Sequence, residues 1–210
     1  ILLCMNNYFH LWNSSSFHLY YLKGVVLVIN SLIVDKSSLY ELSDNITIAY
    51  LLNFLAGCQG ILAQWGSMSF VKVFSEYQVW RCVTHIYLHA GLIHMTMNLV
   101  ALIIAGKYVE KIYGSMWYVL FFHLIAIVDA IICACIFPSE SVGASAGIFA
   151  VIGVLVILLY RKQISIKKSE IIYLIAFFII SLVLGIESLV IHLIALVIGL
   201  MVGWLVKKKC

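Results

Sequence analysis

The feature that most limits the fold of this chain is a succession of apolar segments, each about as long as a bilayer is thick. A helix needs about 20 predominantly apolar residues to cross the hydrocarbon core. Six segments approach that length, at residues 46–65, 89–106, 115–136, 143–160, 170–184 and 187–206. Because unpaired backbone groups are costly in lipid, we expect these segments to be helices. The sequence therefore predicts an all-α polytopic membrane protein, a bundle of six transmembrane helices.

The composition excludes a soluble enzyme, although one short motif suggests it. Gly143-Ala144-Ser145-Ala146-Gly147 matches G-x-S-x-G, the nucleophile elbow of soluble α/β-hydrolases. That elbow needs a sheet with polar surroundings, whereas this chain is 64% hydrophobic and 10% charged. Soluble domains are about 45–50% apolar and about 25% charged. The same small residues suit close packing of membrane helices, so the elbow interpretation is rejected.

The first 45 residues differ from the rest of the chain. The apolar run after Lys23 is only about eleven residues long, which is too short to span a bilayer unaided. We expect residues 1–45 to be an N-terminal region, cytoplasmic or interfacial, with an additional membrane helix as the alternative. Residues 46–210 are expected to form the membrane domain. Within it, Trp80 and Arg81 of the 66–88 loop fit an anchor at the level of the lipid headgroups.

The basic residues indicate the orientation in the membrane. Nine of the thirteen lysines and arginines follow the second, fourth and sixth segments: Lys107, Lys111, Arg161, Lys162, Lys167, Lys168, Lys207, Lys208 and Lys209. The positive-inside rule makes that side cytoplasmic, so both termini are expected there. The net charge of +4 thus reflects helix ends and does not indicate nucleic-acid binding. We expect a multi-pass protein of a bacterial plasma membrane, with no particular oligomeric state indicated.

Four polar residues from three segments reach similar depths in the outer half of the membrane. Ser145 begins the fourth segment, His192 lies in the sixth, and His94 and Asn98 lie one turn apart in the second. Each alone has a structural explanation, as a serine bonded to its own helix or as an interhelical hydrogen bond. Together they supply a nucleophile, a base and donors for an oxyanion. Backbone N–H groups at the start of the fourth helix can also donate to a developing negative charge.

Two longer stretches resemble the rhomboid family of intramembrane serine proteases. The first, residues 80–114, reads WRCVTHIYLHAGLIHMTMNLVALIIAGKYVEKIYG and contains the W-R pair, His94-x-x-x-Asn98 and G-x-x-x-E-K-x-x-G. The second, GASAGIFA, resembles the serine motif at the head of the family's fourth helix. His192 lies where the sixth helix of that family supplies its base. The order and spacing of these motifs match over about residues 46–206.

The resemblance implies a function. Ser145 would be the nucleophile and His192 the general base of a dyad, and His94, Asn98 and the Ser145 backbone N–H would form the oxyanion hole. Such an enzyme cleaves transmembrane substrates near the outer membrane face. Its partners would be transmembrane proteins and the lipid bilayer, and it would need no metal or organic cofactor. The loops at 137–142 and 185–188 would flank the path of water to the site.

The resemblance also implies supporting roles and shows two departures. Phe149 would pack against the His192 ring, Gly143 would leave the serine uncrowded, and Arg81 and Glu110 would be structural. The family often has Gly directly after the serine and Gly three residues after the histidine. This chain has Ala146 and Ala195 there, which bears on efficiency and removes no catalytic group.

Two other functions are weighed against proteolysis. A catalytically weak or silent rhomboid-like protein could bind membrane clients, but that role does not require the serine, both histidines and the asparagine together. A transporter could use His123 and Asp129 of the third segment as a proton path. Those two residues lie six positions apart on different sides of a helix, which favours structural hydrogen bonds.

Overall fold

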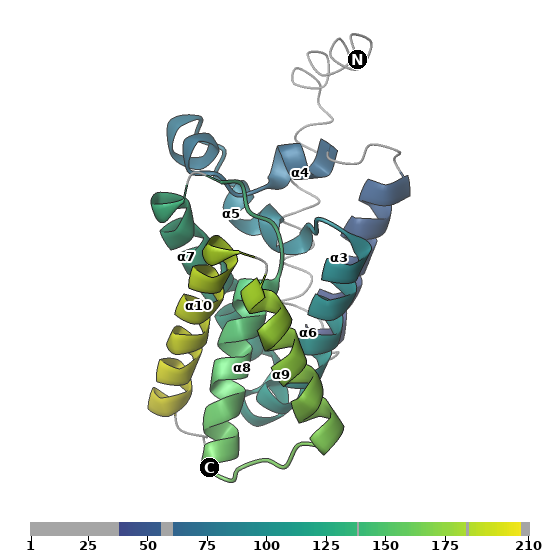
Figure 1. Cartoon of the computed structure of the whole chain (residues 1–210), viewed down its shortest axis with the longest axis vertical. Helices are drawn as coiled ribbons and strands as arrows, with labels where there is room; N and C mark the ends of the chain where they lie inside the picture. Colours follow the sequence, from purple (N-terminus) through teal and green to yellow (C-terminus); the bar gives the residue numbers. More distant parts are fainter. Residues whose placement is uncertain (1–37, 56–60, 138, 184, 207–210) are drawn as a thin grey trace. The chain divides into compact units, whose positions relative to one another are not determined.

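The computed structural model describes residues 38–55, 61–137, 139–183 and 185–206, which all belong to one compact unit, Lys36–Cys210. The longer helices are α3 Ser38–Leu55, α6 Leu92–Tyr113, α7 Ser115–Ile136, α8 Ser145–Tyr160, α9 Lys168–Val183 and α10 Ile186–Leu205 (Figure 1). Short turns lie between α3 and α6: α4 Ile61–Gly66, a π-helix Val71–Ser75, α5 Arg81–Thr84 and a 3-10 helix His85–Tyr87. Most of the predicted N-terminal region lies outside the described residues.

The four C-terminal helices agree closely with the predicted segments. Helix α7 has the predicted bounds, and α8, α9 and α10 begin and end within two residues of them. Helix α6 is the exception among the later segments, because it begins at Leu92 and continues to Tyr113. Its extension carries Lys107 and Lys111, whose long side chains can reach the membrane surface while the backbone remains helical. The predicted end at residue 106 was therefore wrong.

The first membrane segment was also misplaced. Helix α3 runs from Ser38 to Leu55, across the boundary expected at residue 45, and the separate helix α4 follows residues 56–60, which lie outside the described part. The early start has a physical reason. Leu39, Leu42 and Ile46 are fully buried along one face of α3, with polar residues between them. Such a stripe is stabilised by packing, although its average hydropathy is modest.

The described helices make this an all-α membrane protein. Three of them, α6, α7 and α10, are long and apolar enough to cross a bilayer, and α8 is a shorter apolar helix. Within the described ranges, the β pairing consists of one isolated bridge between Met68 and Ser141. The fold class is thereby confirmed, whereas the count of six membrane crossings stays a prediction.

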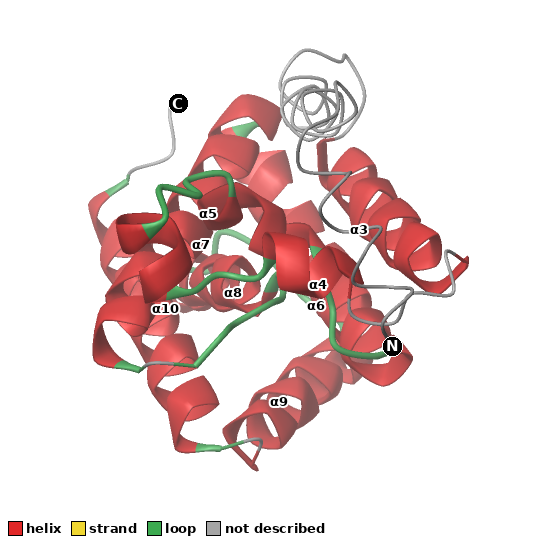
Figure 2. Ribbon diagram, turned by 90° about the horizontal axis from the view of Figure 1, so that it is seen from above, coloured by secondary structure: helices red, strands yellow, loops and turns green. Residues whose placement is uncertain are grey.

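Helix α8 lies at the centre of the described helices. Viewed from above, it is surrounded by α6, α7, α9 and α10 (Figure 2). Every residue from Ala146 to Leu155 is buried, as expected for a helix that is apolar on all sides. Glycines allow α8 and α10 to approach closely: a Cβ on Gly199 would lie 2.0 Å from the Ala150 carbonyl oxygen. This contact has the small-residue character of membrane helix interfaces.

Two loops at one end of the bundle, the 66–88 loop and the loop before α8, are joined by backbone hydrogen bonds. The Met68 N–H donates to the Ser141 carbonyl at 2.9 Å, and the Ser141 N–H donates to the Met68 carbonyl at 3.0 Å. Beside this bridge, Lys72 Nζ pairs with Glu140 Oε1 at 2.5 Å and the Ser67 hydroxyl donates to Glu140 Oε2. Burial raises the pKa of Glu140, but these hydrogen bonds outweigh it and lower the pKa overall. The loop before α8 is therefore tied to the 66–88 loop.

Arg81 does not act as a headgroup anchor. Its side chain is 4% exposed, and its guanidinium donates to the Ser67 carbonyl at 2.9 Å and the Gln64 carbonyl at 2.8 Å. An arginine can satisfy several carbonyls at once through its planar set of donors, which makes it suited to hold an irregular loop. The interpretation of Arg81 as an interfacial anchor is therefore corrected, and its position fits the structural role that the resemblance implied.

Candidate active site

Ser145 is the first residue of α8 and lies at the end of a sharply turned segment. Gly143 has φ +130°, a conformation that residues with a Cβ rarely adopt, and its N–H donates to the His85 carbonyl at 2.9 Å. Ala144 then caps the helix, with helical dihedral angles. The Ser145 side chain is partly exposed, and its N–H is among the first helical donors, which have no intrahelical partner. A hydroxyl and a backbone donor are thus presented together.

His192 lies within hydrogen-bond distance of this serine. Its Nε2 is 2.9 Å from Ser145 Oγ, and the ring is 5% exposed. In the tautomer that can accept the serine proton, Nε2 is unprotonated and the ring proton is on Nδ1. Among the described residues, Nδ1 has no hydrogen-bond partner. The pair has the arrangement required for a serine that is deprotonated by histidine, without a carboxylate behind the ring.

Phe149 holds the plane of the His192 ring. The two rings stack with centroids 4.3 Å apart and planes inclined by 13°, which is the contact that the family resemblance implied. Phe149 is fully buried and lies one turn after Ser145 on α8. The Phe149 ring also contacts the rings of Phe177 and Phe178 of α9. Because Nδ1 has no hydrogen-bond partner among the described residues, the stacking on Phe149 restricts the rotation of the His192 ring.

His94 and Asn98 lie against the segment that precedes the serine. A Cβ built on Gly143 would be 3.0 Å from His94 Cε1 and 3.9 Å from Asn98 Nδ2. Both side chains project from the same face of α6, since they are one turn apart. The absence of a side chain at Gly143 leaves their polar atoms next to the backbone that leads into Ser145. The structure thus brings all four predicted catalytic and oxyanion residues to one place.

Asn98 has unused hydrogen-bonding capacity. Its side chain is 1% exposed, and neither its amide nitrogen nor its amide oxygen has a partner among the described residues. Most buried polar atoms in folded proteins are hydrogen-bonded, so a buried amide without partners calls for an explanation. A side-chain amide that donates a hydrogen bond to a bound molecule would be such an explanation.

Two further histidines support the site from the loop before α6. The His89 ring contacts the His94 ring edge to face, with centroids 5.0 Å apart. Burial, together with the nearby His94, lowers the pKa of His89 to about 3, and burial lowers the pKa of His85 to about 4. His85 Nδ1–H donates to the Arg81 carbonyl at 2.9 Å. Both rings are therefore neutral near pH 7 and help to build the loop.

The two loops expected to flank the water path contact one another. The Ser139 hydroxyl donates to Glu187 Oε2, which joins the segment before α8 to the first turn of α10. Ser139 is exposed and Glu187 is partly exposed, so this hydrogen bond lies at the surface. Neither this contact nor the role of the His85 carbonyl was anticipated. The sequence shows polar residues in both loops, but it does not indicate which of them contact one another.

The remaining predicted residues are Glu110 on α6 and His123 and Asp129 on α7. Glu110 is partly buried near the end of α6, and its carbonyl accepts the Gly114 N–H at 2.7 Å. His123 Nδ1–H donates to the Val119 carbonyl at 2.8 Å, and its Nε2 accepts from the Tyr87 hydroxyl at 2.7 Å. With both nitrogens engaged, His123 has the structural role that was favoured over a proton path. Asp129 is buried and has no hydrogen-bond partner among the described residues.

Comparison with known proteins shows which family the chain resembles. The family model for the Rhomboid domain matches residues 76–209, which include Ser145, His192, His94 and Asn98. The Rhomboid-like protease 3 of Toxoplasma gondii is 30% identical over 129 residues, covering 57% of this chain and 47% of the relative. The mitochondrial RHOMBOID-like protein 6 of Arabidopsis thaliana is 32% identical over 138 residues, covering 65% and 45%.

Another relative bears on activity. The Inactive RHOMBOID-like protein 8 of Arabidopsis thaliana is 28% identical over 93 residues, covering 44% of this chain and 26% of the relative. The chain thus spans less than half the length of each of these three relatives. Similarity at this level extends both to a protein named a protease and to one named inactive, so activity has to be argued from the site.

Proposed function

This chain belongs to the rhomboid family, and we propose that it is an intramembrane serine endopeptidase that cleaves transmembrane proteins with a Ser145–His192 dyad. The observation that carries the proposal is the 2.9 Å distance between Ser145 Oγ and His192 Nε2. The buried amide of Asn98, without a partner among the described residues, lies beside the same loop. A nucleophile, a base and an oxyanion donor together define acyl-transfer chemistry.

The reaction follows from these positions. His192 Nε2 takes the proton of Ser145 as Oγ attacks the carbonyl carbon of the scissile peptide bond. The resulting oxyanion accepts hydrogen bonds from His94, Asn98 and the Ser145 N–H. The carbon–nitrogen bond then breaks, and the protonated His192 returns its proton to the leaving amine. Water, deprotonated in turn by His192, hydrolyses the acyl-enzyme and restores both residues.

The site suits a substrate that comes from the membrane. Ser145 begins an apolar helix, so the scissile bond has to lie near the membrane surface at that end of α8. A peptide carbonyl within a helix is already hydrogen-bonded, so the substrate helix must unwind there before attack. Ser139, in the loop before α8, and Glu187, in the first turn of α10, lie where water would reach the acyl-enzyme.

The orientation is part of the proposal. The basic residues near the C-terminal ends of α6, α8 and α10 favour the cytoplasmic side for that end of the bundle, so Ser145 faces the opposite side. The family does not select one membrane, since a relative from Arabidopsis is named mitochondrial. A bacterial plasma membrane therefore stays a proposal from the sequence.

The experiment compares wild type with Ser145→Ala and His192→Ala in liposomes that contain a fluorescent transmembrane substrate. We expect either substitution to lower cleavage by at least about 10³-fold. A fluorophosphonate probe should label the wild type and not Ser145→Ala. Ser181→Ala, which removes a buried serine of α9, is the matched control and should keep both activities.

The same experiment separates the proposal from its alternative. A catalytically silent protein that binds membrane clients would retain the substrate in pull-down assays while the wild type and all variants show equal background cleavage. That outcome would replace the protease by the client-binding function. The observation that favours this alternative is the similarity to a relative whose name describes it as inactive.

A further inference from the structure

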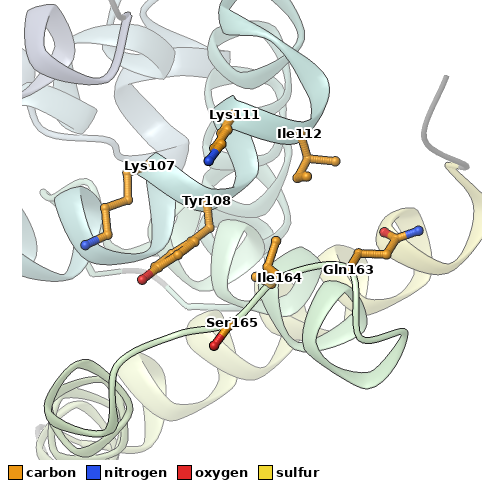
Figure 3. Close-up of a pocket in the computed structure, with 7 residues that line it drawn as sticks. All are labelled: Lys107, Tyr108, Lys111, Ile112, Gln163, Ile164 and Ser165. Atoms are coloured by element: carbon orange, nitrogen blue, oxygen red, sulfur yellow. The ribbon is translucent and has the colours of Figure 1, made fainter. Parts of the chain in front are cut away.

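A cavity of about 470 Å³ lies between the last turns of α6 and the loop that joins α8 to α9. Lys107, Tyr108 and Lys111 line it from α6, and Ile164 and Ser165 line it from the loop (Figure 3). The loop follows the C-terminal end of α8, whereas Ser145 begins that helix. At a rise of 1.5 Å per residue, the cavity is therefore roughly 24 Å from the dyad along α8. It is a separate site.

The charges that line the cavity do not cancel. Lys107 Nζ pairs with Glu170 Oε1 at 2.5 Å, and the Tyr108 hydroxyl donates to Glu170 Oε2 at 2.7 Å. Both oxygens of this carboxylate are thus occupied by residues of α6. Lys111 is exposed and has no ion pair among the described residues. One positive charge on the wall of the cavity remains without a partner there.

The neighbouring loop adds to this positive potential. Arg161, Lys162 and Lys167 lie between α8 and α9, and Lys168 and Glu170 lie in the first turn of α9, where Glu170 is the acid. Arg161 is turned away, because its guanidinium donates to the Gly203 and Trp204 carbonyls of α10. The acid nearest in sequence, Glu110, directly precedes Lys111 and is partly buried. The cavity therefore favours an anion.

This end of the bundle has the features of a membrane surface. Tyr160 is 72% exposed and Trp204 is 55% exposed, and such aromatic side chains gather at the level of the lipid headgroups. The walls combine the Lys111 ammonium and the Ser165 hydroxyl with the apolar Ile164 (Figure 3). An ion that is joined to apolar chains matches that combination better than a free ion, which has no use for the apolar wall.

We propose that this cavity binds the phosphate group of an anionic phospholipid headgroup. Lys111 is its ionic partner, the Ser165 hydroxyl donates a hydrogen bond, and Lys107 contributes the N–H groups that Glu170 does not use. A phosphodiester carries one negative charge, which equals the single uncompensated charge on the wall. A bound lipid would join α6 to the α8–α9 loop at the membrane surface. The proposal does not depend on the catalytic activity.

The test is native mass spectrometry of the full chain in detergent, titrated with phosphatidylglycerol or phosphatidylcholine of the same acyl chains. We expect one phosphatidylglycerol to bind in preference to phosphatidylcholine. A lysine near anionic lipid contributes about 1 kcal/mol, so Lys111→Gln should weaken this binding about fivefold. Lys168→Gln removes the same charge from an exposed position that does not line the cavity, so it should weaken the binding much less than Lys111→Gln does.

Three results would overturn the proposal. Equal binding of the two lipids would show that the phosphatidylglycerol charge is not recognised. Equal weakening by Lys111→Gln and Lys168→Gln would show general attraction to a basic surface and no site. Displacement of the lipid by millimolar glycerol 3-phosphate would identify a site for free phosphate compounds, because a lipid site gains from the apolar wall as well.

Discussion

Ser145 Oγ and His192 Nε2 are 2.9 Å apart, although 47 positions separate the two residues in the chain. Each is carried by a different helix, and these helices, α8 and α10, are in contact where Gly199 lies on the backbone of Ala150. Among the described residues, the other nitrogen of His192 has no partner. The position of the base therefore depends on helix packing and on the Phe149 ring.

Replacement of Phe149 should affect the turnover of the proposed enzyme more than substrate binding. Phe149→Leu keeps most of the buried volume but removes the ring that stacks on His192. Aromatic stacking contributes about 0.5–1.5 kcal/mol, so we expect kcat to fall about 3- to 10-fold with little change in KM. Steady-state kinetics in liposomes would measure this split.

The control for that variant is Phe177→Leu. Phe177 is 3% exposed and stacks on Phe149 with centroids 5.4 Å apart, so its replacement disturbs the same aromatic group. We expect similar losses of thermal stability in the two variants, but a lower kcat only for Phe149→Leu. Equal kcat values would mean that the stack has no part in the placement of His192.

A side chain at position 143 should impair the oxyanion site. In Gly143→Ala, the added Cβ would lie 3.0 Å from His94 Cε1, and φ +130° is unfavourable for alanine. Such strained conformations cost about 1–3 kcal/mol. We expect a loss of kcat/KM of at least tenfold, because the turn and the neighbouring donors must both shift.

Gly114→Ala is the matched control for Gly143→Ala. Gly114 also has positive φ (+89°), but it has open space around it and joins α6 to α7. It should lower stability and leave kcat/KM unchanged; a similar fall for both variants would contradict a local effect at His94.

A methyl group at position 199 should separate α8 from α10. The Cβ of Gly199→Ala would meet the Ala150 carbonyl oxygen at 2.0 Å, a contact that only backbone movement can relieve. Overpacking of this kind costs about 1–3 kcal/mol, and we expect the loss of stability to be accompanied by a loss of cleavage. Val197→Ala, at a half-exposed position of the same helix, should change neither property greatly. Thermal unfolding in detergent and the liposome assay measure the two effects; an unaltered melting temperature for Gly199→Ala would show that the helices are not in close contact there.

Acid should destabilise the loop before α6. Burial lowers the pKa of His85 from 6.5 to about 4, so the unfolded chain binds more protons between these values. Stability is therefore complete above pH 6.5 and is lost as the pH falls toward 4, by about 3 kcal/mol for this residue. His85→Gln keeps a donor for the Arg81 carbonyl but does not titrate. Its melting temperature should fall less than that of the wild type between pH 7.5 and pH 4.5. Parallel losses would mean that His85 does not contribute to acid sensitivity.

Hydropathy located most of the later helices. Helix α7 is predominantly apolar between Gly114 and the loop after Ile136, and its bounds could be predicted because its hydropathy changes abruptly at both ends. Helix α3 could not be found in the same way, since its buried residues alternate with polar ones along a stripe. Lys107 and Lys111 likewise concealed the last turns of α6, because a charged residue lowers the average hydropathy without ending a helix.

The candidate site was predicted from agreement in depth, and its supporting contacts were not. Ser145, His192, His94 and Asn98 could be selected because polar residues are costly in apolar segments and each lay near the same membrane face. No such signal existed for the bond from Gly143 to the His85 carbonyl or for the pairing of Lys72 with Glu140. These contacts join loops whose relative position depends on the whole bundle.

The sequence by itself determined that this chain is a helical membrane protein with polar residues near one membrane face, because hydropathy and helix rise are local properties. The tertiary structure decided which of those residues meet. The 2.9 Å approach of Ser145 to His192 and the stacking of Phe149 require α8 and α10 to be in contact. That contact depends on the fit of Gly199 to the Ala150 backbone. Such a fit involves the surfaces of two helices, so neither segment of the sequence can specify it alone.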